Sequence, residues 1–157
     1  MSNPTDLKLQ ACMQKRPRSL LRLLSITKKD LDWRLTEKLQ ERGYPDFKLG
    51  DMVLLANIQP EGTINNDLAK KARISKQAMS KVVKNLEAAG YILTRKHEKD
   101  NRAVVIFLSE KGKKLMITVS ECVDEIQEVY VSVIGEAENE ALKNTLIKLI
   151  TALHPEI

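Results

Sequence analysis

The chain has 157 residues, of which 43% are hydrophobic and 30% charged, so it can build a core and wholesale disorder is excluded. Six glycines, five prolines and 4% aromatic residues favour a mostly helical fold over a mostly β one. No apolar run is long enough to span a membrane, and the N-terminus lacks the apolar core of a signal peptide. We therefore expect a cytoplasmic protein with no membrane partner.

The positive charge is concentrated in one third of the chain. The formal net charge is +5. Residues 62–114 hold 13 Lys and Arg against five Asp and Glu, a net charge of +8, whereas the other residues carry −3. Such a segment is compatible with nucleic acid, an anionic membrane surface or no charged partner.

The N-terminal third predicts two helices. The first 16 residues are polar and mixed, and we expect them to be frayed or weakly helical. A helical stripe follows from Arg18 and ends at Gly43-Tyr44-Pro45. Its apolar positions are Leu20, Leu24, Leu31, Leu35 and Leu39. A second apolar helix is expected around residues 49–58, up to the turn residues Pro60-Glu61-Gly62.

A helix pair and a hairpin are expected next. A short helix over about Asn66–Ala72 precedes a longer one, for which Ser75 is the N-cap and Gly90 the terminating glycine. Tyr91–Arg95 and Val104–Leu108 are predicted to be the two strands of a β-hairpin with a polar tip.

Two striped helices complete the chain. Ser109 is expected to begin a long helix, whose apolar positions alternate by four and three residues in a heptad seam. The seam consists of Leu115, Val119, Cys122, Ile126, Val129 and Val133. Gly135 interrupts it, and a last helix carries Leu142, Leu146, Leu149 and Leu153.

The helix pair has the pattern of a helix-turn-helix. Two helices that cross steeply need a small residue at the crossing, which Ala69 supplies. Apolar side chains must fill the angle between them, and they are Leu68, Ala72, Ile74, Met79 and Val82. Ser75 and the opposite face of the second helix present Lys76, Gln77, Ser80, Lys81 and Lys84. Such a helix fits the major groove of double-stranded DNA. The alternative is an ordinary amphipathic pair with a solvated basic face.

The hairpin favours the DNA-binding interpretation, because a basic wing after the second helix can reach the flanking minor groove. Its predicted phosphate or minor-groove contacts are Arg95, Lys96, Lys99 and Arg102.

These residues resemble the MarR family of winged helix-turn-helix transcription regulators, and the resemblance covers nearly the whole chain. It is carried by Asp-Leu-Ala-Lys at 67–70, Ile-Ser-Lys-Gln-Ala-Met-Ser-Lys at 74–81, Leu-Glu-Ala-Ala-Gly-Tyr-Ile at 86–92, Asp-Asn-Arg-Ala at 100–103 and Leu-Ser-Glu-Lys-Gly at 108–112. It implies that Asp100 orients Arg102, and that Arg102 enters the minor groove. The chain departs from many relatives at the turn, where Arg73 replaces a glycine.

The resemblance also implies a homodimer on a palindromic operator. We expect residues 1–44 and 113–157 to form the dimerisation region around a winged helix-turn-helix domain at 45–112. The predicted dimer contacts are Leu20, Leu24, Leu115, Val119, Cys122, Ile126, Val129, Leu142, Leu146, Leu149 and Leu153. A three-helix bundle within one chain would bury the same stripes and is the alternative.

Relatives of this kind often release DNA when a small, frequently phenolic, effector binds. Trp33, Tyr44, Phe47 and Met52 are the candidate lining of such a pocket, and core packing is the alternative. Cys12, beside Lys15 and Arg16, is a candidate oxidant sensor, whereas Cys122 fits a small core residue.

No cofactor or catalytic activity is predicted. His97 and His154 have no neighbours at metal-ligand spacing, and no catalytic triad, carboxylate pair or phosphate-binding glycine loop is visible. We therefore expect a sequence-specific DNA-binding regulator, most often a repressor by resemblance. A non-specific architectural DNA binder and a winged-helix protein-interaction module are the alternatives.

Overall fold

The computed structural model describes residues 3–72, 74–98 and 103–155 and is mostly helical, with one small antiparallel sheet, as the composition predicts. In chain order the elements are α1 (Pro4–Lys15), a 3-10 turn (Arg16–Arg18), α2 (Leu20–Glu41), a second 3-10 turn (Leu49–Asp51), α3 (Met52–Leu55), β1 (Thr63–Ile64), α4 (Asn65–Ala72), α5 (Lys76–Ala88), β2 (Ile92–Lys96), β3 (Val104–Leu108), α6 (Glu110–Ile134) and α7 (Glu136–Leu153).

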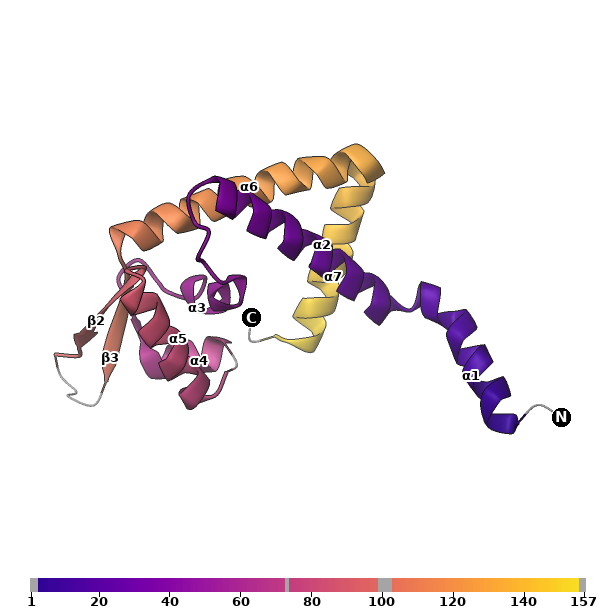
Figure 1. The fold of residues 1–157 in the computed structure, drawn as a ribbon, viewed down its shortest axis with the longest axis horizontal. Helices are drawn as coiled ribbons and strands as arrows, with labels where there is room; N and C mark the ends of the chain where they lie inside the picture. The colour runs from indigo at the N-terminus through magenta and orange to yellow at the C-terminus, as the bar shows by residue number, and fades with distance from the viewer. Residues whose placement is uncertain (1–2, 73, 99–102, 156–157) are drawn as a thin grey trace.

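The N-terminal segment, expected to be frayed or weakly helical, is a regular helix over Pro4–Lys15. The Asn3 side chain accepts a hydrogen bond from the Thr5 amide at 3.0 Å, and Pro4 is suited to the first turn. No residue of α1 is buried, and Figure 1 shows the helix projecting away from the rest of the chain.

The apolar run at residues 49–58 forms less helix than expected. It contains one 3-10 turn and the four-residue α3, after which the Asn57 and Ile58 amides bond three residues back in turns. Leu54, Leu55 and Ile58 are nevertheless buried. The hydrophobicity of this run therefore marks core positions rather than a long helix.

The sheet has the strand order β1-β3-β2, with both pairings antiparallel. Ile92 lies opposite Leu108 and Lys96 opposite Val104, so β2 and β3 pair along their full length as the predicted hairpin. Strand β1, which pairs Thr63 with Ile106, is too short to show an alternating pattern in the sequence.

One core joins the sheet, α3, α4, α5, α2 and α6. Leu54 of α3, Leu68 of α4, Met79 of α5 and Ile92 and Ile106 of the sheet belong to it. Three residues predicted to contact a dimer partner, Leu115, Cys122 and Ile126, are buried in the same core with Leu35 and Leu39 of α2. These three positions of the seam are therefore buried within their own chain and are not accessible to a partner.

Helix α2 runs beside α6, and α7 folds back from the far end of α6 (Figure 1). Gly135 makes that corner with φ +86°, as its place in the sequence predicts. Lys38 bonds Glu125 at 2.5 Å, and Arg42 pairs with Glu125 and Glu121, so ion pairs link α2 to α6. No helix of the described residues is long and apolar enough to cross a membrane.

Candidate nucleic-acid interface

Helix α5 begins where its cap was predicted. The Ser75 hydroxyl oxygen accepts a hydrogen bond from the Ala78 amide at 3.2 Å, which satisfies one of the free donors of the first turn. The helix ends at Gly90, where φ is +77°. Capping thus occupies the oxygen of Ser75, while its hydroxyl proton can still be donated to a partner at the helix N-terminus.

The two faces of α5 differ in the way that the sequence pattern predicts. Met79 and Leu86 are buried against the core, and Val82 and Val83 are partly buried. The exposed face presents Lys76, Gln77, Ser80, Lys81 and Lys84. The Ser80 hydroxyl donates to the Lys76 carbonyl oxygen at 2.9 Å, so its oxygen is available as an acceptor. This face therefore combines positive charge with donors and acceptors that can contact base edges.

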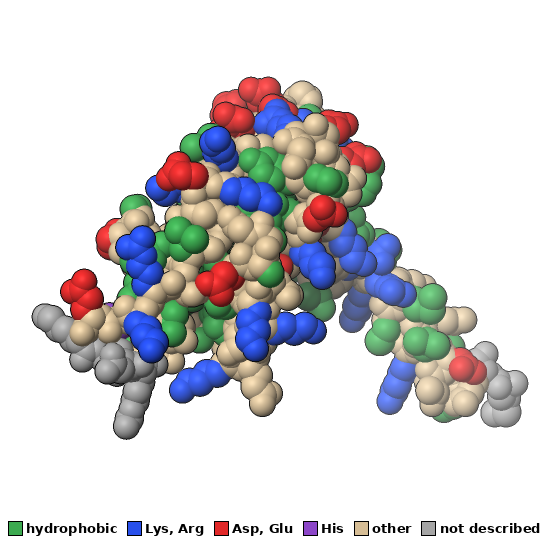
Figure 2. Space-filling model, turned by 60° about the vertical axis from the view of Figure 1, so that its left-hand side comes forward, with side chains coloured by type: hydrophobic (Ala, Val, Ile, Leu, Met, Phe, Trp, Pro, Cys, Tyr) green, Lys and Arg blue, Asp and Glu red, His purple; other side chains and the backbone are tan. Residues whose placement is uncertain are grey.

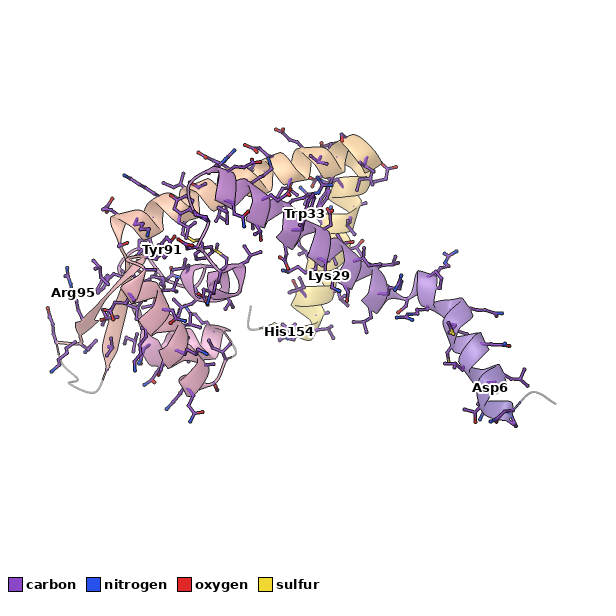
Figure 3. The ribbon with its side chains drawn as sticks, in the orientation of Figure 1. Asp6, Lys29, Trp33, Tyr91, Arg95 and His154 are labelled. Carbon is purple, nitrogen blue, oxygen red and sulfur yellow. The ribbon has the colours of Figure 1, made fainter. Side chains whose placement is uncertain are left out.

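The hairpin carries its exposed basic residues next to α5. The side chains of Arg95 and Lys96 are exposed, and the Arg95 guanidinium lies 5.4 Å from the centre of the Phe107 ring. Figure 3 shows Arg95 on the outer side of the wing. The hydroxyl of Thr94 donates to Glu87 of α5 at 2.5 Å, so the wing is tied to the helix. The predicted tip contacts Lys99, Asp100 and Arg102 lie outside the described residues.

Positive side chains gather on the side of the molecule that contains α5 and the wing. Figure 2 shows Lys and Arg side chains projecting from the lower edge of the view, while many of the acidic side chains lie at the upper end. This separation matches the uneven charge along the sequence. The face can attract a polyanion over a distance of about one Debye length, ~10 Å at 0.1 M salt.

A tight joint connects α5 and the sheet to α6. Lys111 Nζ donates to the carbonyl oxygen of Ala89 at 2.7 Å and lies 4.3 Å from the centre of the Tyr91 ring. The Ser109 hydroxyl donates to the Gly90 carbonyl oxygen at 2.5 Å and accepts from the Gly112 amide at 3.0 Å. Pattern reasoning missed this joint, because its contacts join residues about 20 positions apart.

The comparisons with known proteins agree with this geometry. A model of the MarR family matches residues 49–104, from the turn before α3 to the start of β3. The HTH-type transcriptional regulator FarR of Neisseria gonorrhoeae is 30% identical over 132 residues, which cover 84% of this chain and 77% of FarR. The chain belongs to the MarR family of transcriptional regulators. The predicted family is thereby confirmed, and it is a family of regulators rather than enzymes.

Solved structures show that the whole MarR fold is shared. A MarR transcriptional regulator from Methanosarcina mazei Go1 has a TM-score of 0.72 at 21% identity, covering 87% of this chain and 96% of its own. S. aureus MepR, solved as a complex with DNA, has a TM-score of 0.70 at 25% identity, covering 87% of this chain and 99% of its own. Likeness therefore extends beyond the winged helix-turn-helix to the flanking helices.

The four predicted effector residues of this MarR protein do not lie together. Tyr44 and Phe47 surround Tyr91, with ring centres 6.5 and 5.5 Å away, and Met52 packs against the core. Trp33 is 57% exposed on α2 beside Arg34, and Figure 3 shows that it lies away from Tyr91. Tyr44 and Phe47 therefore pack at the joint, and Met52 packs against the core.

The remaining predicted dimer contacts of the MarR protein are accessible, except for two. Val119 packs against the core and Leu146 is half-buried. The exposed ones are Leu20, Leu24, Val129, Leu142, Leu149 and Leu153. Further exposed apolar side chains lie on α1, α2, α6 and α7: Leu7, Leu9, Met13, Leu21, Leu23, Ile26, Val133, Ile147 and Ile150.

The two cysteines lie in different surroundings. Cys12 is exposed on α1, where its predicted redox role stays a prediction. Cys122 is buried, and burial raises the pKa of its thiol, which suits a small core residue. Among the described residues, no three His, Cys, Asp or Glu side chains gather where they could hold a metal ion.

Proposed function

We propose that this MarR-family protein binds double-stranded DNA in a sequence-specific manner, as a homodimer on a palindromic operator. By resemblance it acts as a repressor that a small aromatic effector releases. The observation that carries the proposal is the exposed face of α5, on which Gln77 and Ser80 stand between lysines, next to the basic strand end at Arg95 and Lys96. The likeness to MepR in its DNA complex supports it.

Each side-chain type has a chemical role at such an interface. An amide like that of Gln77 can pair with an adenine through two hydrogen bonds, and the Ser80 oxygen can accept from a base amino group. Lys76, Lys81 and Lys84 neutralise phosphates or donate to guanine. The resemblance adds Lys99, Asp100 and Arg102 at the wing, with Arg102 in the minor groove. Phosphate contacts set the register, and base contacts set the sequence.

The dimer is proposed from the exposed apolar surface of α1, α2 and α7. Large exposed apolar patches on a chain usually mark an interface with another protein. A two-fold axis would place the two copies of α5 about 34 Å apart, one turn of DNA, so that they read a palindrome. Static light scattering at micromolar concentration tests this step, and a monomer would contradict it.

DNA binding is tested with two duplexes of equal length, one from the region upstream of the gene that encodes this protein and one of shuffled sequence. We expect the upstream duplex to bind at least ~1,000-fold more tightly, with affinity falling steeply as salt rises from ~50 to ~200 mM. Equal affinity for both duplexes would favour an architectural binder instead. Absence of any salt-sensitive binding would favour a protein-interaction module.

A further inference from the structure

A second basic segment lies at the N-terminus, apart from the helix-turn-helix and the wing. Residues 3–29 form α1, the first 3-10 turn and the start of α2, and they are called the basic arm below. The arm holds seven Lys and Arg against a single acid, Asp6, a net charge of +6. The seven are Lys8, Lys15, Arg16, Arg18, Arg22, Lys28 and Lys29. The net charge of −3 outside residues 62–114 therefore combines this arm with a remainder of −9.

The cations of the arm are exposed and mostly lack counter-charges. All seven residues are exposed to solvent. Lys28 forms an ion pair with Asp32, and none of the other six forms one within the part of the chain that the structure describes. Like charges that are held close together repel each other, and an anion bound between them relieves this repulsion. The arm is therefore suited to a partner with many negative charges.

Helical spacing gathers part of this charge on one face of α1. Lys8 and Lys15 are seven positions apart, about two turns, and Cys12 lies between them on the same side of the helix. The apolar side chains do not share a face, because Leu7 and Leu9 are two positions apart and point in nearly opposite directions. A helix that lies on a membrane surface needs one continuous apolar face, so the pattern of α1 disfavours a lipid partner.

The arm reaches the same side of the molecule as the helix-turn-helix. In Figure 1, α1 descends to the same edge as α4 and α5 and lies on the side of α5 away from the wing. Figure 2 shows Lys and Arg side chains on the arm, which projects at the lower right, as well as along the lower edge of the body. The 12 residues of α1 span about 18 Å, so its cations extend the basic surface beyond the exposed face of α5.

We propose that the basic arm binds the phosphate backbone of DNA on the side of α5 away from the wing, through Lys8 and Lys15 of α1 and Arg16 and Arg18 of the turn. This inference rests on the proposed function. Double-stranded DNA carries one negative charge per about 1.7 Å of its axis, so a helix as long as α1 spans enough phosphates for these cations. In the proposed dimer, the contacted backbone lies between the two half-sites.

A second copy of the chain is the competing partner for the arm. Residues 115–157, which include most of α6 and all of α7, carry a net charge of −6 and could attract the arm of a neighbouring copy. DNA is favoured because the arm lies at the edge that holds α5, whereas many of the acidic side chains lie at the upper end of the view in Figure 2.

The salt dependence of DNA binding tests the contact in a double variant, Lys8→Gln with Lys15→Gln. Two cations in each chain correspond to four phosphates in a dimer, and each contact contributes about 0.9 to the slope of log affinity against log salt. We expect a slope that is shallower by about 3–4 in the variant and an affinity at least ~10-fold lower at ~50 mM salt. The ratio between upstream and shuffled duplexes should not change, because phosphate contacts carry no sequence information.

The matched control is Lys143→Gln with Lys148→Gln, which removes the same charge from α7. This control should keep the slope of the unaltered chain. Light scattering of the arm variant without DNA tests the competing partner. A variant with the slope of the control overturns the proposal, and so does a variant whose dimer dissociates more readily, because its cations then bind the second copy.

A cleavage reagent on α1 locates the contacted backbone. Cys12 is exposed and Cys122 is buried, so iron–EDTA can be tethered to Cys12 of the full chain. We expect it to cut the upstream duplex between the two half-sites. Cys12→Ser with Asn144→Cys moves the reagent to an exposed position of α7 and should not cut there. A bound duplex that Cys12 leaves uncut overturns the arm contact and leaves the proposed function standing, whereas a chain that binds neither duplex contradicts the proposed function and overturns both.

Discussion

Gly112 and Tyr91 approach each other too closely for any side chain at position 112. A Cβ atom built on Gly112 would lie 2.1 Å from the Tyr91 carbonyl oxygen. The same carbonyl oxygen accepts a hydrogen bond from the Ser109 amide at 3.0 Å. Since Gly112 belongs to the first turn of α6 and Tyr91 immediately precedes β2, this contact fixes how α6 leaves the winged helix-turn-helix.

Gly112→Ala should destabilise the protein, although alanine is the better helix former. The helix gains about 1 kcal/mol in propensity, but the overlap with Tyr91 forces the backbone apart. We expect a net loss of about 1–3 kcal/mol in the free energy of unfolding, measured by urea titration at fixed protein concentration.

The matched control for this substitution is Gly50→Ala. A Cβ on Gly50 meets nothing within 4 Å, and the residue lies in a 3-10 turn. G50A should leave stability unchanged or raise it by up to ~1 kcal/mol. If G112A is as stable as G50A, then the close approach at the joint does not constrain the fold.

Lys111→Met tests the second contact of the joint. The substitution keeps an aliphatic side chain but removes the bond from Nζ to the Ala89 carbonyl oxygen and the charge over Tyr91. We expect the free energy of unfolding to fall by about 1 kcal/mol. Lys113→Met is the control, because Lys113 forms a local, solvent-exposed ion pair with Glu110 on the surface of the same helix, and such pairs contribute little to stability. Equal losses in the two variants would exclude a special role for Lys111.

The helix-turn-helix and the hairpin could be predicted because their signals are local. Ser75 caps the helix that follows it, Gly90 takes the positive φ that ends that helix, and Val104–Leu108 forms a strand with the bounds that its apolar run suggests. Each signal lies within a few residues of the structure it specifies. The exposed set from Lys76 to Lys84 follows from the helical period alone.

The contacts between distant elements could not be predicted in this way. A heptad seam shows that Leu115, Cys122 and Ile126 are buried, but it does not show whether a partner or α2 buries them. The cluster of Asp30, Arg34 and Tyr130 joins residues 100 positions apart. Asn139 looks in the sequence like any polar residue of a surface helix, yet it is 6% exposed in the structure.

Acid should weaken the packing of α2 on α6 through Glu125. Hydrogen bonds from Lys38 and then Arg42 hold the pKa of Glu125 below its usual range. A carboxyl whose pKa is lower in the folded state contributes stability above its unfolded pKa, and this is lost as the pH falls through the folded pKa. Between about pH 6 and pH 3 the unaltered chain should therefore lose more stability than Glu125→Gln.

Thermal unfolding at several pH values measures this difference, and Glu128→Gln provides the control on an exposed carboxyl of the same helix. E128Q should follow the pH profile of the unaltered chain. Parallel profiles for E125Q and the unaltered chain would show that the ion pairs with Lys38 and Arg42 do not stabilise the fold.

Gln77→Ala should reduce sequence discrimination more than overall affinity. Gln77 stands on the exposed face of α5, where an amide can contact a base but cannot neutralise a phosphate. We expect the affinity for the upstream duplex to fall by about 1–3 kcal/mol, with little change for the shuffled duplex. Gln127→Ala, an exposed site on α6, should change neither. An equal fall for both duplexes would place Gln77 on the phosphate backbone.

Arg102→Ala tests the wing, whose tip the family resemblance assigns to the minor groove. Removing the guanidinium should cost about 1–3 kcal/mol in binding to the upstream duplex, with the thermal unfolding midpoint unchanged. Lys148→Ala is the control. It removes one positive charge from an exposed position on α7, outside the wing, and should reduce the affinity for the upstream duplex less than Arg102→Ala does. Fluorescence anisotropy at two salt concentrations separates the two effects, since a long-range charge effect weakens with salt and a groove contact persists. If both variants bind equally well at each salt concentration, then the wing does not contact the DNA through Arg102.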